Sequence, residues 1–526
     1  MKKLLYNTLF IAALMILATS CFKDLDTVPL DKDVVTAASV YEDPAAYKQV
    51  LAKLYAGLAV SGQTGAAGNA DISGIDEGFG QYLRGYWYMQ ELTTDEAVIG
   101  WNDQTIKDLH FQTWGASDVF ITAFYYRTIY QVTLCNEFIR ETTDGKLDDR
   151  GVSGELRDEI NYFRAEARFL RALSYWHAMD CFGNPPFVTE ENSAGAFFPE
   201  QIQRVDLFNY VESELLAVEN LMMEPRSNEY GRADKAALWT LLAKVYLNAE
   251  VYIGQPKYTE CITYCKKVIE AGYTLEPDYK KLFLADNDHN AEVIFPVNFD
   301  GVHTKTWGGT TFIIHAAIGG TMDPLAYGVA GGWGGTRTTP DFVDIFGENN
   351  TSDHRAMFHK DGQNKEIEDI GLFNDGWAIT KWKNVTSTGI AGSDNTYTDT
   401  DFPMFRLADV YLMYGEAVLR GGTGGDEATA INYFNEIRRR AYGNSNGNVT
   451  AIDLDKILSE RAKELYWECH RRTDLIRYGK FTGGEYLWAW KGNVKDGIAT
   501  DAHYNLFPIP SADMTANLNL KQNDGY

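Results

Sequence analysis

The stretch RAEARFLRALSYWHAMDCFGNPP, residues 164–186, decides the fold class of this chain. Its apolar residues recur at the helical period, so that Phe169, Leu173 and Trp176 fall largely on one face. The sequence Gly-Asn-Pro-Pro at 183–186 is a helix stop signal, because proline cannot continue a helix. The stretch therefore predicts a long amphipathic helix that ends just before residue 183.

Two further segments predict pairs of helices. Residues 234–272 have two helical patterns separated by a turn at 254–256, and residues 407–419 and 428–439 repeat this layout. Helix–turn–helix units of this size are similar to tetratricopeptide repeats, which stack so that neighbouring units bury one continuous core. We therefore expect a mainly α fold built on a tetratricopeptide-like scaffold of helix pairs.

Two regions interrupt the helical pattern. Residues 61–105 are rich in glycine, aspartate and aromatic residues, and residues 295–405 mix glycine, threonine, asparagine and aromatic residues, with Gly-Gly-Trp-Gly-Gly at 331–335. Such composition predicts loops and short strands inserted into the scaffold. Binding residues concentrate on loops that a rigid scaffold positions, so we expect the functional site in these two regions.

Composition limits the classes of ligand. The chain has 526 residues, of which 45% are hydrophobic and 23% charged, so it is globular. A formal net charge of -25 opposes nucleic acid and anionic membrane surfaces as partners. Aromatic residues make up 13%, and we expect some of them to be displayed for binding. The length suggests about three domains, but a repeat scaffold fits one domain over residues 21–526.

The N-terminus predicts an export signal. Lys2 and Lys3 precede an apolar run from Leu9 to Leu17, which is too short to span a bilayer. Small residues then lead to Cys21, an order that resembles a bacterial lipobox with Ala18 at the position usually held by leucine. Residues 1–20 are thus a predicted lipoprotein signal peptide and Cys21 the predicted lipidation site. The alternative is an ordinary signal peptide followed by an incidental cysteine.

Enzymatic activity is not expected. The sequence contains no H-E-x-x-H or Walker-type motif, and no G-x-S-x-G in the strand–turn–helix setting of a nucleophile elbow. A glycosidase needs two carboxylates that face one glycosidic bond. Adjacent acids such as Asp95 and Glu96 arise by chance among 73 acidic residues, so they give no support for such a pair.

Two local patterns leave an alternative open. Cys261 and Cys265 are four apart on an expected helix, and we interpret them as two buried thiols rather than a disulfide or a metal site. Asp286 and Asp288 begin like a calcium loop, but the glycine and the closing glutamate of that motif are missing. A solvated acidic turn is favoured over a structural calcium site there, and no cofactor is expected.

Six segments carry motifs that occur together and in this order in one known family. They are Cys21 with Asp24-Leu25-Asp26, and residues 164–186, 231–237, 245–249, 460–477 and 508–526. Together they resemble the SusD/RagB family of outer-membrane glycan-binding lipoproteins. The resemblance implies a lipid-anchored protein at the cell surface that works with a SusC-like TonB-dependent transporter. Arginine and aspartate within these segments are interpreted as ion-pair partners that stabilise the fold.

Three tryptophans in the loop regions suit a carbohydrate ligand. Trp101, Trp307 and Trp333 each stand beside glycine or polar residues. Flat aromatic rings pack against the C–H faces of a sugar, and polar side chains bind its hydroxyls. A curved oligosaccharide needs several such rings in an arc. The alternative is that each tryptophan belongs to the core.

The resemblance extends to the site. The family's starch-binding prototype presents aromatic residues from three loops, and the matching positions imply a glycan-binding set here. That set is Trp101, Trp307, Trp333, Asp76, Arg84, Gln104 and Asn102. Trp307 stands where the prototype has tyrosine, Gln104 replaces asparagine, and Ile99 replaces a tryptophan, which removes one stacking face.

The expected function follows from this site. The chain is expected to bind a neutral polysaccharide and to deliver oligosaccharides to the transporter. The preferred candidate for the polysaccharide is starch or another α-glucan. One alternative is a different neutral glycan. The other is a transporter lid without a glycan site of its own.

Overall fold

The computed structural model describes residues 37–62, 65–66, 70–192, 195, 197–347 and 352–526. Contacts divide the chain into a unit Met1–Tyr47, which contains α2 (Ala37–Val40), and a unit Lys48–Tyr526. The larger unit is described here by itself. The predicted signal peptide (1–20) and the predicted lipidation site Cys21 lie outside the described residues.

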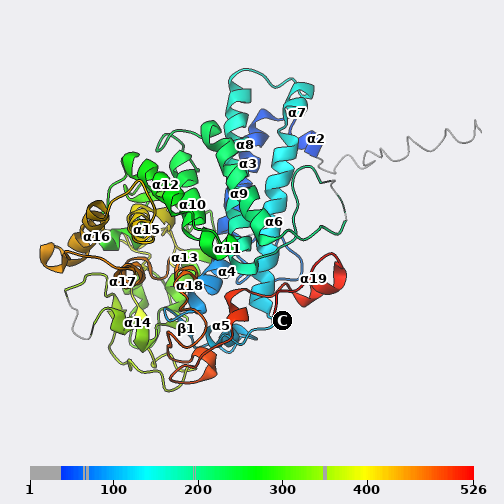
Figure 1. Cartoon of the computed structure of the whole chain (residues 1–526). Coiled ribbons are helices and arrows are strands. Elements are labelled where there is room, and N and C mark those ends of the chain that lie inside the picture. The colour runs from blue at the N-terminus through cyan, green and yellow to red at the C-terminus, as the bar shows by residue number, and fades with distance from the viewer. Residues whose placement is uncertain (1–36, 63–64, 67–69, 193–194, 196, 348–351) are drawn as a thin grey trace, which may run out of the picture. The chain divides into compact units, whose positions relative to one another are not determined.

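The helix predicted from residues 164–186 is α8 (Glu155–Phe182), which lies alongside α6 (Val119–Glu141) in Figure 1. It ends as predicted, with Gly183 at a φ of 70°. It begins earlier than predicted, because Glu155 and Asp158 in its first turn favour the positive end of the helix dipole. Phe169, Leu173 and Trp176 are buried, which confirms the predicted apolar face.

Both predicted helix pairs are present. The first consists of α10 (Lys235–Leu247) and α12 (Tyr258–Glu270), with the short α11 (Ala249–Ile253) ahead of the predicted turn. The second consists of α15 (Leu407–Leu419) and α16 (Glu427–Tyr442). Helix α12 packs on both α10 and α15, so the two pairs form one continuous layer, as Figure 1 shows. The mainly α fold with paired helices is confirmed.

The remaining elements complete the scaffold. The other α-helices are α3 (Pro44–Ala59), α4 (Tyr82–Trp87), α5 (Ile106–Phe111), α7 (Asp144–Asp149), α9 (Arg204–Val218), α13 (Gly309–Ala316), α14 (Pro340–Ile345), α17 (Leu454–Leu465), α18 (Arg471–Arg477) and α19 (Ser511–Ala516). Short 3-10 helices include η3 (Tyr279–Phe283) and η4 (Pro324–Tyr327), and a π-helical turn, η1 (Tyr88–Leu92), follows α4.

The strands are short and pair antiparallel across large sequence separations. In the described residues they make three two-stranded sheets. The pairs are β1 (Val98–Ile99) with β3 (Thr336–Arg337), β2 (Val293–Val297) with β6 (Phe402–Arg406), and β4 (Phe358–His359) with β5 (Ala378–Ile379). The first of these pairs joins the two predicted loop regions.

One element departs from the predicted loop regions. Helix α13 lies within residues 295–405, and every residue from Gly309 to Ala316 is buried. Its apolar run Phe312-Ile313-Ile314 lacks the polar face of a surface helix, so its period does not stand out in the sequence. The helix forms because neighbouring elements bury it on all sides.

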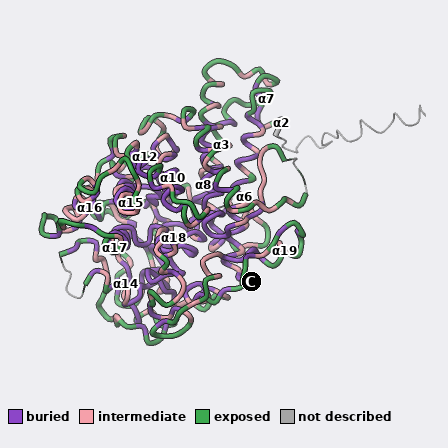
Figure 2. The backbone as a smooth tube through the Cα atoms, viewed as in Figure 1, coloured by how far each residue is buried: buried purple, intermediate pink, exposed green. Residues whose placement is uncertain are grey.

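The interior contains charges as well as apolar side chains. Figure 2 shows buried backbone running through the middle of the helical layers and exposed backbone at the outer turns. A group that we call the ion-pair core consists of Arg355, Lys381, Arg406, Arg440, Glu292, Glu460, Glu464 and Glu468. Arg406 Nη1 lies 2.6 Å from Glu464 Oε1, and Arg406 Nε lies 2.6 Å from Glu468 Oε2.

The charged residues of the family-like segment 460–477 are used in the same way. Arg461 Nε lies 2.7 Å from Asp474 Oδ2, and Arg477 Nε lies 2.6 Å from Glu416 Oε1. All four side chains are buried. The interpretation of these residues as structural ion-pair partners is confirmed.

Candidate functional site

The three predicted tryptophans lie together. The ring centroids of Trp101 and Trp333 are 6.3 Å apart with an interplanar angle of 45°, and those of Trp307 and Trp333 are 6.1 Å apart at 59°. Each side chain is half-buried, so each ring keeps an accessible part. The alternative, in which each tryptophan is a separate residue of the core, does not fit three half-buried rings in contact with one another.

Strand pairing brings Trp101 and Trp333 together. Trp101 follows β1 and Trp333 precedes β3, and the backbone N–H of Gly100 donates to the Gly335 carbonyl at 2.9 Å. The indole N–H of Trp101 donates to the Trp333 carbonyl at 3.1 Å. Gly335 is needed for this close approach, because an added Cβ would lie 2.5 Å from the Trp101 ring.

Trp333 rests on a residue that the sequence did not single out for the site. The His315 ring, in the last turn of α13, stacks against Trp333 with centroids 4.8 Å apart at 19°. His315 Nδ1 lies 2.7 Å from the Gly331 carbonyl, and Nε2 lies 2.9 Å from the Thr396 carbonyl. Burial lowers the pKa of His315. A neutral ring has one N–H, so it donates to one of these two carbonyls while it contacts both loops and supports the tryptophan.

Arg84 and Asp76 approach the cluster from the first loop region. Arg84 Nη1 donates to the Trp307 carbonyl at 2.8 Å, and its guanidinium carbon lies 4.5 Å from the Phe312 ring centroid. Asp76 Oδ1 accepts the backbone N–H of Gly78 at 2.7 Å. A Cβ on Gly78 would lie within 3.4 Å of Asp76, Arg84 and Trp307, so the three residues surround this glycine.

The other two predicted polar residues are placed differently. Asn102 and Gln104 are exposed and follow Trp101 in the chain. The Asn102 side chain accepts a hydrogen bond from Lys107 Nζ at 2.6 Å, and Gln104 has a left-handed φ of 44°. Their part in glycan binding stays a prediction. Ile99 is 1% exposed within β1, so this position offers no surface for stacking.

A fourth aromatic residue belongs to the cluster. The ring of Tyr397 lies 5.1 Å from that of Trp307 at 49°, and Lys305 Nζ lies 5.8 Å from the tyrosine ring centroid. Tyr397 stands among polar residues in the second loop region, Asp394-Asn-Thr-Tyr-Thr-Asp399, the same signal that selected the tryptophans. We call Trp101, Trp307, Trp333, Tyr397, Arg84 and Asp76 the aromatic site.

The adjacent acids Asp95 and Glu96 lie away from any surface. Asp95 is 0% and Glu96 2% exposed, and Arg471 Nη2 lies 2.7 Å from Asp95 Oδ2. Glu96 Oε2 accepts the backbone N–H of Trp467 at 3.0 Å. Burial raises the pKa of Glu91 to about 7, and burial together with the charge of Glu91 raises the pKa of Glu96. These carboxyl groups cannot reach a polysaccharide.

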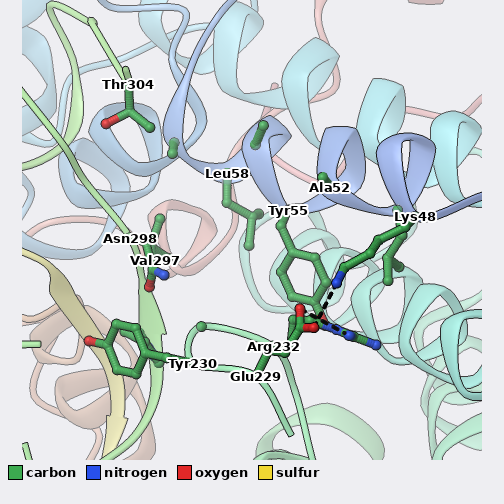
Figure 3. Close-up of a pocket in the computed structure, with 15 residues that line it drawn as sticks. Lys48, Ala52, Tyr55, Leu58, Glu229, Tyr230, Arg232, Val297, Asn298 and Thr304 are labelled. Carbon is green, nitrogen blue, oxygen red and sulfur yellow. Dashed lines mark hydrogen bonds and ion pairs between the residues drawn. The ribbon is translucent and has the colours of Figure 1, made fainter. Parts of the chain in front are cut away.

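A separate cavity of about 260 Å³ lies between α3 and the segment 229–232. Figure 3 shows Tyr55 and Leu58 pointing into it from α3, with Tyr230 on the facing segment. Two of its polar side chains are already paired, because Tyr55 donates to Glu166 and Lys48 Nζ lies 2.6 Å from Glu229. What remains accessible is mainly apolar wall, which suits a sugar less well than the aromatic site.

The structure also places the cysteine pair Cys261 and Cys265 and the acidic residue Asp286. Cys261 and Cys265 are buried free thiols with sulfurs 4.0 Å apart, as interpreted. Asp286 accepts hydrogen bonds from the backbone N–H and the hydroxyl of Ser387, at 2.8 and 2.6 Å. Among the residues that the structure describes, no three His, Cys, Asp or Glu side chains are grouped to hold a metal. The preference for a solvated acidic turn over a calcium site at Asp286 and Asp288 stays a prediction.

Over the same described ranges, none of the helices combines the length and the apolar character that crossing a membrane requires.

Comparisons with known proteins agree with this fold. The family model described as SusD family matches residues 363–526. Surface glycan-binding protein A from Bacteroides fluxus superposes with a TM-score of 0.70 at 23% identity, covering 92% of this chain and 99% of that one. A structure described as a laminarin binding SusD-like protein also gives 0.70, at 19% identity, with 92% and 99% covered. At these identities the structures show a shared fold alone.

The sequence relationship is closer. The starch-binding protein SusD of Bacteroides thetaiotaomicron is 35% identical to this chain, over 100% of this chain and 99% of that protein. A SusD-like protein P25 of Formosa agariphila is 25% identical, over 80% of this chain and 81% of that protein. With its helix pairs, its ordered motifs and this full-length similarity, the chain belongs to the SusD family.

Proposed function

We propose that this chain binds a neutral glycan without cleaving it. The first candidate for this glycan is starch or another α-glucan. The aromatic site is the observation that carries the proposal. Its four rings are inclined to their neighbours by 45°, 59° and 49°, so together they offer a curved rather than a flat surface. An α-glucan coils, and its successive sugar faces turn in a way that can follow such rings.

The polar members of the site suit sugar edges. Asp76 is exposed, and its second carboxylate oxygen is available to a hydroxyl, while Arg84 is half-buried beside Trp307. Binding by a few stacked rings need not be tight, because millimolar affinity corresponds to only about -4 kcal/mol. Several proteins on one long polymer gain further through avidity. The similarity to a starch-binding protein supports an α-glucan as the first candidate.

Affinity electrophoresis tests the proposal. The folded protein is run in native gels that contain amylose, pullulan, dextran or levan, and we expect retardation in amylose and pullulan. A triple variant with Trp101, Trp307 and Trp333 replaced by alanine should run as in a gel without glycan. The matched control is Trp239→Ala, which removes a half-buried tryptophan of α10 outside the site and should leave retardation unchanged.

The outcomes separate the alternatives. Retardation in none of the gels by a folded protein contradicts glycan binding and favours a transporter lid without its own site. Retardation in levan or dextran alone identifies a different neutral glycan. Retardation that survives the triple substitution rejects the aromatic site while leaving glycan binding intact. Release of reducing sugar by the purified protein would show an enzyme instead.

We further propose that the chain is a lipoprotein of the outer-membrane surface that hands oligosaccharides to a SusC-like TonB-dependent transporter. Family membership and the order of residues before and after Cys21 support this. A labelled fatty acid should be incorporated by the natural chain and not by Cys21→Ala. Copurification of a large transporter from solubilised outer membranes tests the partnership, and its absence would contradict the delivery step.

A further inference from the structure

Away from the aromatic site, a cavity of about 480 Å³ is lined by lysines. Three segments form its walls: η3 and the residues after it, the lead into β4, and the chain from β5 to residue 387. Backbone hydrogen bonds fix these walls to one another, from Lys383 N–H to the Phe283 carbonyl at 3.0 Å and from Thr380 N–H to the Met357 carbonyl at 2.9 Å. The cavity is therefore part of the fold rather than a gap between free loops.

The cations of this cavity are unusual for so acidic a chain. Lys280, Lys281 and Lys383 line it together with His354. Within the described part of the chain, none of the three lysines has a carboxylate within 4.0 Å, although the chain carries 73 acidic residues. A fourth lysine of the wall, Lys381, differs because its Nζ lies 2.6 Å from Glu468.

The nearby acids are engaged elsewhere. Asp278, the one acidic residue among the described residues of the wall, accepts the backbone N–H of Lys280 at 3.2 Å. Asp286 accepts hydrogen bonds from the backbone N–H and the hydroxyl of Ser387, which also lines the cavity. Neither carboxylate forms an ion pair with Lys280, Lys281 or Lys383, so neither neutralises the charge of this wall.

Lys383 is costly in this position. It is half-buried, its Nζ lies 4.7 Å from the Tyr327 ring centroid, and it shares the cavity with Lys280. Burial, and after it the like charge of Lys280, lower the pKa of Lys383. Lys280 and Lys281 are exposed, so the cost of burial falls on Lys383 alone. A buried charge is tolerated when an opposite charge offsets that cost. An anion in the cavity would provide that charge.

The chemistry of the walls selects the type of anion. Ammonium groups act as point charges that come from separate directions, whereas planar carboxylates are matched by the fork of arginine, and no arginine lines this cavity. A tetrahedral oxyanion has oxygens that can face several ammonium groups at once. The hydroxyl of Thr386 lies on the same wall and adds a donor, whereas the Ser387 hydroxyl already donates to Asp286.

We propose that this lysine-lined cavity binds a phosphate-type oxyanion, either free or as the ester group of a larger molecule. Its volume is within the usual range for small-molecule sites and leaves room for more than the anion itself. The net charge of -25 repels extended anionic surfaces, so a small anion that enters the cavity is favoured over a membrane. The site is independent of the proposed glycan function.

Calorimetric titration with inorganic phosphate, at constant ionic strength set by chloride, tests the proposal. The natural protein should bind phosphate, and the double variant Lys280→Gln with Lys383→Gln should bind it at least tenfold more weakly. The control double variant Lys266→Gln with Lys521→Gln removes the same charge at exposed positions outside the cavity and should bind as the natural protein does. Lys281→Gln alone, at an exposed position, should give a smaller loss and covers the case in which the double variant fails to fold.

No heat of binding to the natural protein, or equal binding to the cavity and control variants, overturns the proposal. Sedimentation with vesicles distinguishes the sources of the anion. Binding to phosphatidylcholine vesicles that contain phosphatidic acid, reversed by inorganic phosphate, identifies a lipid phosphate. Binding of inorganic phosphate without sedimentation identifies a free anion, and both results support an oxyanion site.

Discussion

The aromatic site and the ion-pair core use polar chemistry in opposite ways. In the ion-pair core, every charged side chain is at most 4% exposed and meets opposite charges, as Arg406 does between Glu464 and Glu468. In the aromatic site the rings are half-buried, and Asp76 keeps an exposed carboxylate. Buried charges whose partners all lie within the protein are not available to a ligand, whereas side chains that stay partly accessible to solvent are. The two regions should therefore respond separately to substitution.

The largest expected effect is on the ion-pair core. Arg406→Met should lower the free energy of unfolding by about 3–5 kcal/mol, because it leaves buried carboxylates without one of their partners. Urea unfolding measures this. In the control, Lys456→Met removes an exposed ion pair with Asp453 and should change stability by no more than about 1 kcal/mol. If Arg406→Met changed glycan affinity per folded molecule, the two regions would not be separate.

The second effect depends on pH and on the buried acids behind β1. Burial raises the pKa of Glu91 in the folded protein to about 7, from 4.5 for an ordinary glutamate. Between these values the folded state binds more protons than the unfolded state, so this residue's contribution to stability falls as pH rises. Glu91→Gln should remove a loss of up to about 3 kcal/mol across that window.

The observable for Glu91 is the difference between two stability curves measured by urea unfolding from pH 4.5 to 7. Burial lowers the pKa of His110 to about 4, so that residue has the opposite slope in both proteins and cancels in the difference. Parallel curves for the natural protein and Glu91→Gln would contradict the prediction. Glycan affinity at pH 7 should be equal in the two proteins.

A single methyl group tests the geometry of the aromatic site. Gly335→Ala should lower glycan affinity about tenfold, or ~1.4 kcal/mol, because its Cβ would displace the Trp101 ring from Trp333. Gly331→Ala is the matched control, since an added Cβ there meets nothing within 4 Å. Calorimetric titration with maltooligosaccharides measures both. Equal affinities would show that the spacing of these two rings does not matter for binding.

The smallest effect concerns the ring that sequence reasoning missed. Tyr397→Ala should weaken glycan binding several-fold, because it removes the ring beside Trp307 at the end of the cluster. Tyr397→Phe keeps the ring and should retain most of the affinity, so the pair separates stacking from the hydroxyl. If both variants bind like the natural protein, the site ends at Trp307 and the curved surface is shorter than proposed.

Sequence patterns predicted the scaffold better than the site. The periods of α8, α10, α12, α15 and α16 stand out because each helix pairs an apolar face with polar residues or clear end signals. The buried α13 has no polar face opposite its apolar residues, so its sequence predicts a loop region instead of a helix. The early start of α8 was also missed, since its first turns are polar on most sides.

The grouping of the site was predictable only through the family resemblance. Trp101 and Trp333 meet because two-residue strands pair across more than two hundred residues, and neither strand has a pattern of its own. No sequence pattern around His315 points to the site, because its role as a support depends on where α13 ends. Tyr397 carried the same local signal as the tryptophans, so a wider search of that loop would have included it.

The fixed position of Arg84 has a consequence for binding thermodynamics. Its guanidinium donates to the Trp307 carbonyl and the Tyr88 hydroxyl and lies over Phe312 before any ligand arrives. An arginine side chain carries about 2 kcal/mol of rotamer entropy, and here that entropy is lost during folding. The entropy cost of binding then falls mainly on the glycan, so a cyclic or already coiled oligosaccharide should bind with a smaller penalty than a flexible linear one of the same composition.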